Sequence, residues 1–122
     1  TEVPCTRQGG ARGFQELWSR DERPTAIVAF SDIIALGVLD AAREAGVSVP
    51  GEVSVSGFDD LAEAGWASPA LTTVRQPIES KGRLAAEFLV ESISASDVSR
   101  GHQHRLHTTL LIRESTGPVR AV

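Results

Sequence analysis

One strand–helix–strand pattern constrains the fold more than any other feature of the sequence. Residues 26–30 form an unbroken apolar run, which is typical of a central strand in a parallel sheet. Ser31 and Asp32 are good N-caps for a helix predicted over 32–45, and a second strand is predicted over 53–58. This order of elements predicts a βαβ unit with a right-handed crossover. The fold class that follows is α/β, a parallel sheet flanked by helices.

Hydrophobic spacing predicts four further elements. Apolar residues at helical intervals predict a short amphipathic helix over 10–19 and a longer helix from 77 to about 93. Apolar runs predict a third strand over 71–74 and a last strand over 106–112. We expect residues 113–122 to form a polar tail.

Composition places the chain among globular proteins. Its 122 residues, 41% hydrophobic and 23% charged, are enough to bury a core. The formal net charge is -4 and the basic residues are scattered, so the chain lacks the footprint of a nucleic-acid-binding surface. The single cysteine, Cys5, excludes an internal disulfide, and no apolar run approaches the ~18 residues of a membrane span. Because the sequence contains no methionine, we expect Thr1 not to be a natural start and the chain to be a fragment or a processed piece.

Polar side chains follow each of the first three predicted strands. They are Ser31 and Asp32, then Asp59 and Asp60, and then Gln76. Ligands of parallel α/β sheets bind outside the carboxyl ends of the strands, so we expect these groups to form a polar ring at the mouth of a cleft. For Ser31, Asp32 and Asp60 the alternative is a capping role at a helix or a turn.

The helix after the first strand carries two apolar stripes, whereas a helix on one face of a sheet needs only one. The second stripe consists of Ile33, Leu36 and Leu39. It predicts contact with a neighbouring domain or subunit, or else with a further helix of the same domain. Trp66, in a loop expected over 59–70, is either an interface anchor or a stacking surface for a ligand ring.

No motif in the sequence supports an enzyme. There is no Gly-x-Ser-x-Gly elbow, no His-Glu-x-x-His and no phosphate loop. His102, His104 and His107 have a spacing that brings two imidazoles to one side of an extended segment, but histidines are common in solvent loops such as the one expected over 94–104. We therefore expect no catalytic residues, no metal and no cofactor.

Five short motifs follow one another along most of the chain. They are RPTAI at 23–27, SDxxALG at 31–37, GVxVPxEVSVxGFDD at 46–60, PxLTTVxQP at 69–77 and RES at 113–115. Together with Gly82, and in unbroken order, they resemble the C-terminal half of the LacI/GalR family of bacterial transcription regulators.

The resemblance implies a periplasmic-binding-protein-like fold of type I, in which two α/β lobes surround a cleft, and of which this chain is an incomplete part. Residues 1–77 would belong to the C-terminal lobe, 78–105 would be a helix and loop that cross to the other lobe, and 106–122 the final strand and tail. The crossing helix would then lack its natural partner, so we expect it to expose an apolar face and the chain alone to oligomerise. That face consists of Leu84, Phe88 and Leu89.

The implied function is the effector-sensing and dimerisation part of a transcriptional repressor. It binds a small polar metabolite such as a sugar between two lobes, acts as a homodimer in the cytoplasm, and reaches operator DNA only through an N-terminal helix-turn-helix domain absent from these residues. The alternative is a periplasmic solute-binding protein of a transporter. A basic helix-turn-helix upstream would indicate the regulator, and a signal peptide the transporter component.

The resemblance also implies the contact residues. The positions that match the family's ligand contacts are Ser31 or Asp32, Asp59 and Gln76. Family members often place a large aromatic residue, which stacks on the ligand, at the position of Cys5.

The second apolar stripe has a counterpart in the family as well. Ile33, Leu36 and Leu39, with the loop 61–69 that contains Trp66, correspond to the family's dimerisation surface. The resemblance therefore favours contact with a second subunit.

Overall fold

A computed structural model describes residues 1–94 and 103–119 of the chain. The chain divides into two compact units, one of Thr1–Arg75 with Leu110–Val122 and the other of Gln76–Thr109. The middle of the predicted loop 94–104, with His102, lies outside the described residues.

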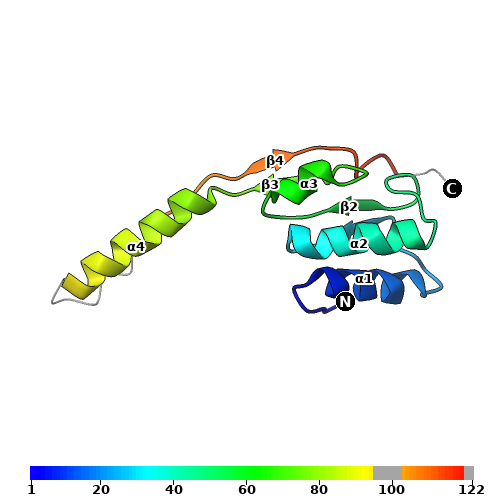
Figure 1. Cartoon of the computed structure of the whole chain (residues 1–122), viewed down its shortest axis with the longest axis horizontal. Helices are drawn as coiled ribbons and strands as arrows, with labels where there is room; N and C mark the ends of the chain where they lie inside the picture. The colour runs from blue at the N-terminus through cyan, green and yellow to red at the C-terminus, as the bar shows by residue number, and fades with distance from the viewer. Residues whose placement is uncertain (95–102, 120–122) are drawn as a thin grey trace. The chain divides into compact units, whose positions relative to one another are not determined.

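The first unit contains the predicted βαβ pattern. Strand β1 (Ala26–Val28), helix α2 (Asp32–Glu44) and strand β2 (Ser54–Ser56) follow one another, and β1 pairs with β2 in parallel (Figure 1). Ile27 lies opposite Val55 in this pairing. The prediction of a parallel α/β fold is confirmed, although β1 and β2 are each shorter than the predicted strand.

A second two-stranded sheet continues this unit. It pairs β3 (Thr73–Arg75) with β4 (Thr109–Leu111), and a parallel bridge between Ser56 and Thr72 connects the end of β2 to the start of β3. The carboxyl ends of β1, β2 and β3 therefore belong to one continuous edge of the fold.

Helix α1 (Arg7–Trp18) packs against α2, and the two lie side by side in Figure 1. A Cβ atom on Gly37 would lie 1.8 Å from the carbonyl oxygen of Arg7, so the two helix backbones approach more closely than any side chain would allow. Thr6 caps α1 by accepting a hydrogen bond from the Gly9 N–H.

The core of the first unit contains two of the three residues of the second stripe on α2. Leu36 and Leu39 are 4% and 6% exposed and belong to the same apolar cluster as Val55 and Leu71, whereas Ile33 is 41% exposed. Leu36 and Leu39 are therefore buried within this chain. For these two residues, the structure fits the alternative prediction of contacts inside the same domain.

One prediction of irregular structure was wrong. Residues 59–70 contain a five-residue helix, α3 (Ala62–Trp66), which has no side-chain cap and is too short to show an apolar repeat. The polar tail is in part a structural connection, because the buried Ser115 hydroxyl donates to the carbonyl of Val55 at 2.6 Å and accepts from the N–H of Thr72 at 2.8 Å. Such a partner more than forty residues away leaves no local signal.

The second unit consists mainly of helix α4 (Ile78–Ser94), which has no buried residue. Leu89 is 61% exposed, Leu84 is half-buried, and the half-buried Phe88 ring lies 6.5 Å from the ring of His104. The prediction of an exposed apolar face is confirmed for Leu89. Of the helices in the described residues, none is long and apolar enough to cross a membrane.

Candidate functional site

The polar residues that follow β1 and β2 meet at one edge of the first unit. The N–H of Asp32 donates to the carbonyl of Phe58 at 2.8 Å, and the N–H of Asp59 donates to the carbonyl of Val74 at 2.9 Å. These bonds place the start of α2 beside the end of β2, and the end of β2 beside β3. The convergence expected from parallel strand ends is present in the fold.

Asp32 is the fully buried member of this group. Its Oδ1 accepts from the hydroxyl of Thr73 at 2.5 Å and its Oδ2 accepts from the N–H of Leu61 at 2.8 Å. Gly57 leaves room for the carboxylate, because a Cβ atom there would lie 2.3 Å from Oδ1. Both oxygens are therefore used to join the start of α2 to β3 and to the segment after β2, and a ligand would reach them only by displacing Thr73 or Leu61.

Ser31 caps helix α2, a role that the sequence allowed for either Ser31 or Asp32. Its Oγ accepts from the N–H of Ile34 at 3.4 Å, so Ser31 and not Asp32 is the N-cap of α2. The half-buried Ser31 Oγ also lies 3.5 Å from the Sγ of Cys5, whose side chain is exposed. The structure therefore brings Cys5 beside Ser31, at the point where the N-termini of α1 and α2 adjoin.

Asp59 and Asp60 form a tight turn after β2. Their φ angles are 118° and 60°, a region that residues with a side chain rarely adopt. The half-buried Asp59 lies three residues after the end of β2, and its backbone forms a bridge to Arg75 at the end of β3. The turn therefore holds the Asp59 side chain at the edge where the strand ends meet.

Asp60 is the centre of an ion-pair cluster that the sequence did not predict. Arg75 Nε donates to its Oδ2 at 2.7 Å, and Arg113 Nη2 donates to its Oδ1 at 2.6 Å. Burial raises the pKa of Asp60, but the hydrogen bonds from Arg75 and Arg113 lower it more, so that its pKa lies below the usual value. Asp60 therefore forms ion pairs, whereas the alternative predicted from the sequence was a turn cap. The pair with Arg113 could not be predicted from sequence spacing, because the two residues are 53 positions apart.

Gln76 is the first residue of the second unit, whereas the other candidate residues belong to the first unit. Its side-chain oxygen accepts from Lys81 Nζ at 3.2 Å, one turn into α4. His104 and His107 are described, and no group of three or more potential metal ligands lies within residues 1–94 and 103–119.

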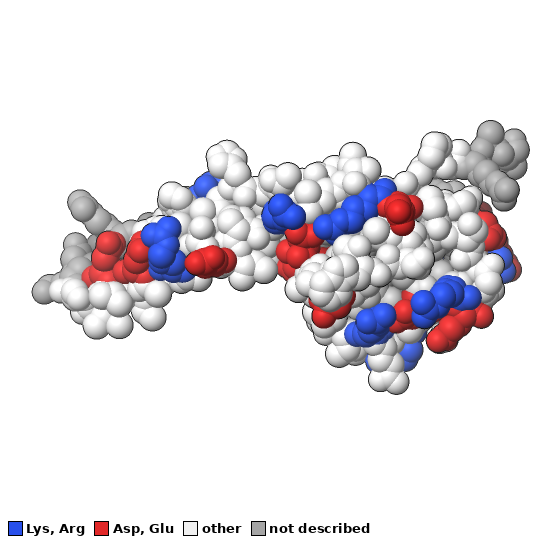
Figure 2. Space-filling model, turned by 45° about the horizontal axis from the view of Figure 1, so that its top comes forward, with Lys and Arg blue, Asp and Glu red and all other residues white. Residues whose placement is uncertain are grey.

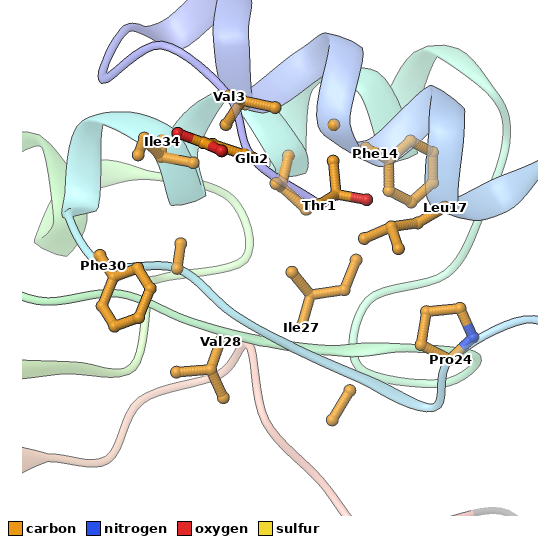
Figure 3. A pocket seen from close by; sticks show the side chains of 15 residues that line it. Thr1, Glu2, Val3, Phe14, Leu17, Pro24, Ile27, Val28, Phe30 and Ile34 are labelled. Atoms are coloured by element: carbon orange, nitrogen blue, oxygen red, sulfur yellow. The ribbon is translucent and has the colours of Figure 1, made fainter.

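An apolar hollow of about 610 Å³ lies between α1, α2 and β1 (Figure 3). Phe14, Leu17, Ile27, Phe30 and Ile34 are among its lining residues, and none of the polar strand-end residues contributes to it. Its mostly apolar lining does not suit a polar ligand. It lies beside the edge of β1 that pairs with no other strand in the described part of the chain.

Charged side chains are mixed rather than segregated on the surface. Figure 2 shows basic and acidic groups interspersed on the face that it presents, without a broad basic area there. With a net charge of -4, this face lacks the electrostatic character of a DNA-binding surface.

The fold and this site define the class to which the chain belongs. Residues 2–116 match the model of the periplasmic binding protein-like domain family, and the chain belongs to that family. It is homologous to LacI-family regulators, as the motifs predicted. One such relative is the HTH-type transcriptional repressor PurR of Pectobacterium atrosepticum, 36% identical over 115 residues that make up 93% of this chain and 33% of the relative.

Solved structures agree with this assignment. A LacI family transcriptional regulator from Enterococcus faecalis with bound ribose is 30% identical and superposes with a TM-score of 0.84, covering 98% of this chain and 43% of that chain. A putative transcriptional regulator LacI from Bacillus cereus subsp. cytotoxis is 34% identical with a TM-score of 0.87, covering 92% and 39%. The chain spans about a third of the length of the curated relatives it matches, which is consistent with a fragment of a two-lobe core.

Proposed function

We propose that this chain is the effector-sensing and dimerisation part of a LacI/GalR-type transcriptional repressor that binds a small polar metabolite, a sugar or a related compound. The observation that carries the proposal is that Ser31 and Asp59 follow the neighbouring parallel strands β1 and β2, with Cys5 beside Ser31, in a chain homologous to repressors. The ribose bound to the Enterococcus faecalis regulator supports a sugar-like ligand. The periplasmic solute-binding alternative is not favoured, because the curated relatives matched here are repressors.

Asp59 is the main specificity residue in this proposal. A carboxylate accepts two hydrogen bonds from neighbouring hydroxyls, which suits a sugar-like ligand. Ser31 and Cys5 contribute a hydroxyl and a small polarisable side chain, and Gln76 contributes an amide. Asp32 holds the floor of the site through Thr73 and Leu61, and is the member of the predicted set that is fully buried.

The proposed mechanism is a population shift in a protein without catalytic activity. Residues 1–77 belong to one lobe, 78–105 cross to the other, and 106–122 return as the final strand and tail. The effector binds between the lobes and favours one of two arrangements, which changes the affinity of a homodimer for operator DNA. DNA contact belongs to a helix-turn-helix domain outside these residues, and the protein acts in the cytoplasm.

The proposed dimer surface centres on α2 and α3. Ile33 and Trp66 are 41% and 82% exposed, and an exposed tryptophan is a frequent anchor of protein interfaces. Leu36 and Leu39 line a groove of about 260 Å³ together with Trp66. In this arrangement, Ile33 and Trp66 make the contacts with the second subunit, and the two leucines form the floor of the groove.

A thermal-shift screen tests the site on the full-length protein with D-ribose, other sugars and nucleosides. We expect at least one compound to raise the Tm of the wild type. Asp59→Asn should abolish this increase, whereas the exposed Asp21→Asn should keep it. An unchanged response of the Asp59→Asn variant would exclude Asp59 as the main contact, and the absence of any response in the wild type would count against a sugar-like effector.

A further inference from the structure

The chain passes between its two units at two points, and each point lies within a few residues of an arginine that binds Asp60. The first crossing is the Arg75–Gln76 bond and the second is the Thr109–Leu110 bond. Arg75 is the last residue of β3, and Arg113 follows β4 by two residues. One carboxylate, Asp60, accepts a hydrogen bond from each of these arginines.

Arg113 ties its segment to the first unit at three places. Besides its bond to Asp60, its Nη1 donates to the carbonyl of Leu71 at 2.9 Å and its backbone N–H donates to Thr72 Oγ1 at 2.9 Å. The side chains of Arg113 and Asp60 are largely shielded from solvent, at 23% and 11% exposure. An ion pair that is buried to this degree, and whose guanidinium also donates to a second acceptor, is stronger than an exposed surface pair.

The backbone before this carboxylate is held in an unfavourable conformation. Positive φ angles at Asp59 and Asp60 persist only where neighbouring groups fix them, and here the Asp59 N–H bonds to Val74 while the Asp60 carboxylate bonds to Arg75 and Arg113. These bonds involve Val74 and Arg75, directly before the first crossing, and Arg113, three residues after Leu110 at the second.

We propose that Asp60 is a positioning residue that fixes both crossing segments to the first unit, and that it connects them to the ligand contact at Asp59. The anchoring follows from the geometry of this unit alone, whereas the connection to a ligand rests on the function proposed above. Because Asp60 is joined to Asp59 by one peptide bond, a backbone shift at Asp59 moves the carboxylate and therefore the hydrogen bonds that hold both crossings.

Amide hydrogen exchange on the ligand-free protein tests the anchoring. Asp60→Asn should raise exchange about tenfold or more in peptides covering 72–76 and 109–113, with little change in α2 and β2. Asp40→Asn is the matched control, because Asp40 also bridges two arginines, Arg7 and Arg43, but in a part of the first unit without a crossing. It should leave the crossing peptides as in the wild type.

Two results would overturn the proposal. Wild-type exchange at both crossings in Asp60→Asn would show that the carboxylate anchors neither, and an equal increase across the whole first unit would assign Asp60 a general stabilising role. If Asp60→Asn does not fold, Arg113→Lys provides the second measurement. Its charge is kept, but a lysine lacks the fork that bonds Asp60 and Leu71 together, so faster exchange confined to 109–113 is expected and unchanged exchange contradicts the proposal.

The connection to the ligand has a separate test, isothermal titration of the full-length protein with D-ribose. We expect Asp60→Asn to bind with an affinity within about threefold of the wild type while losing the ligand-dependent change in exchange at the crossings. A ligand-dependent change that persists in Asp60→Asn overturns the connection. Failure of the wild type to bind any compound of the screen would instead refute the proposed function and leave the ligand-free exchange result as it stands.

Discussion

Removal of the Asp32 carboxylate should destabilise the first unit more than the loss of any exposed carboxylate. In Asp32→Ala, the buried Thr73 hydroxyl and the part-buried Leu61 N–H both lose their acceptor. An unsatisfied buried polar group costs about 1–3 kcal/mol, so the two together predict a loss of about 2–6 kcal/mol. Total stabilities of about 5–15 kcal/mol make this a large fraction of the free energy of unfolding.

A second substitution at the same position separates the charge from the hydrogen bonds. The Asn side chain in Asp32→Asn keeps the shape, its oxygen can accept from Leu61, and its amide nitrogen can donate to Thr73 Oγ1. The hydroxyl hydrogen of Thr73 then lacks its acceptor, so we expect a smaller loss of about 1–3 kcal/mol. The order of stability should be wild type, then Asn, then Ala.

Urea unfolding followed by the fluorescence of Trp18 and Trp66 measures these differences. With a slope of about 1–2 kcal/mol per M, a loss of about 3 kcal/mol lowers the midpoint by about 2 M. Asp21→Ala, at an exposed carboxylate, should stay within about 0.5 kcal/mol of the wild type. An Asp32→Ala variant within about 1 kcal/mol of the wild type would refute the structural role of this carboxylate.

Three further predictions follow from the packing and the charges. Gly37→Ala should lower the free energy of unfolding by about 1–3 kcal/mol, because the new Cβ would lie 1.8 Å from the Arg7 carbonyl oxygen. The control is Gly82→Ala, which should be neutral or stabilising because a Cβ there has no atom within 4 Å. Equal Tm values for the two variants would contradict this. Because the pKa of Asp60 in the folded protein lies below its unfolded value of about 4, the Asp60 carboxylate should stabilise the fold fully above that pH and lose this effect as the pH falls through the folded pKa. The difference in the free energy of unfolding between the wild type and Asp60→Asn should therefore shrink at acid pH. A constant difference from pH 7 to pH 2 would argue against this. The 122-residue chain alone should self-associate through the exposed face of α4, and a monodisperse monomer in light scattering would contradict that expectation.

The sequence was informative wherever a structural element depends on its own residues. The apolar run at 26–30 and the cap at Ser31 specify β1 and the start of α2, since strand burial and helix capping involve neighbours in the chain. The motifs around Asp59 predicted the family correctly. Helix α3 was missed because five residues are too few to show a helical period.

The sequence by itself determined the fold class, the family and the polar residues that end the strands. Only the tertiary structure decided what each of them does. Asp32 is bound by Thr73, 41 positions further along the chain, and Asp60 by Arg113, 53 positions away, so both roles depend on partners that no local pattern specifies. Residue type and spacing fix the conformation of short segments, whereas a buried carboxylate takes its role from whichever distant donors the packing of the strands brings within hydrogen-bond distance.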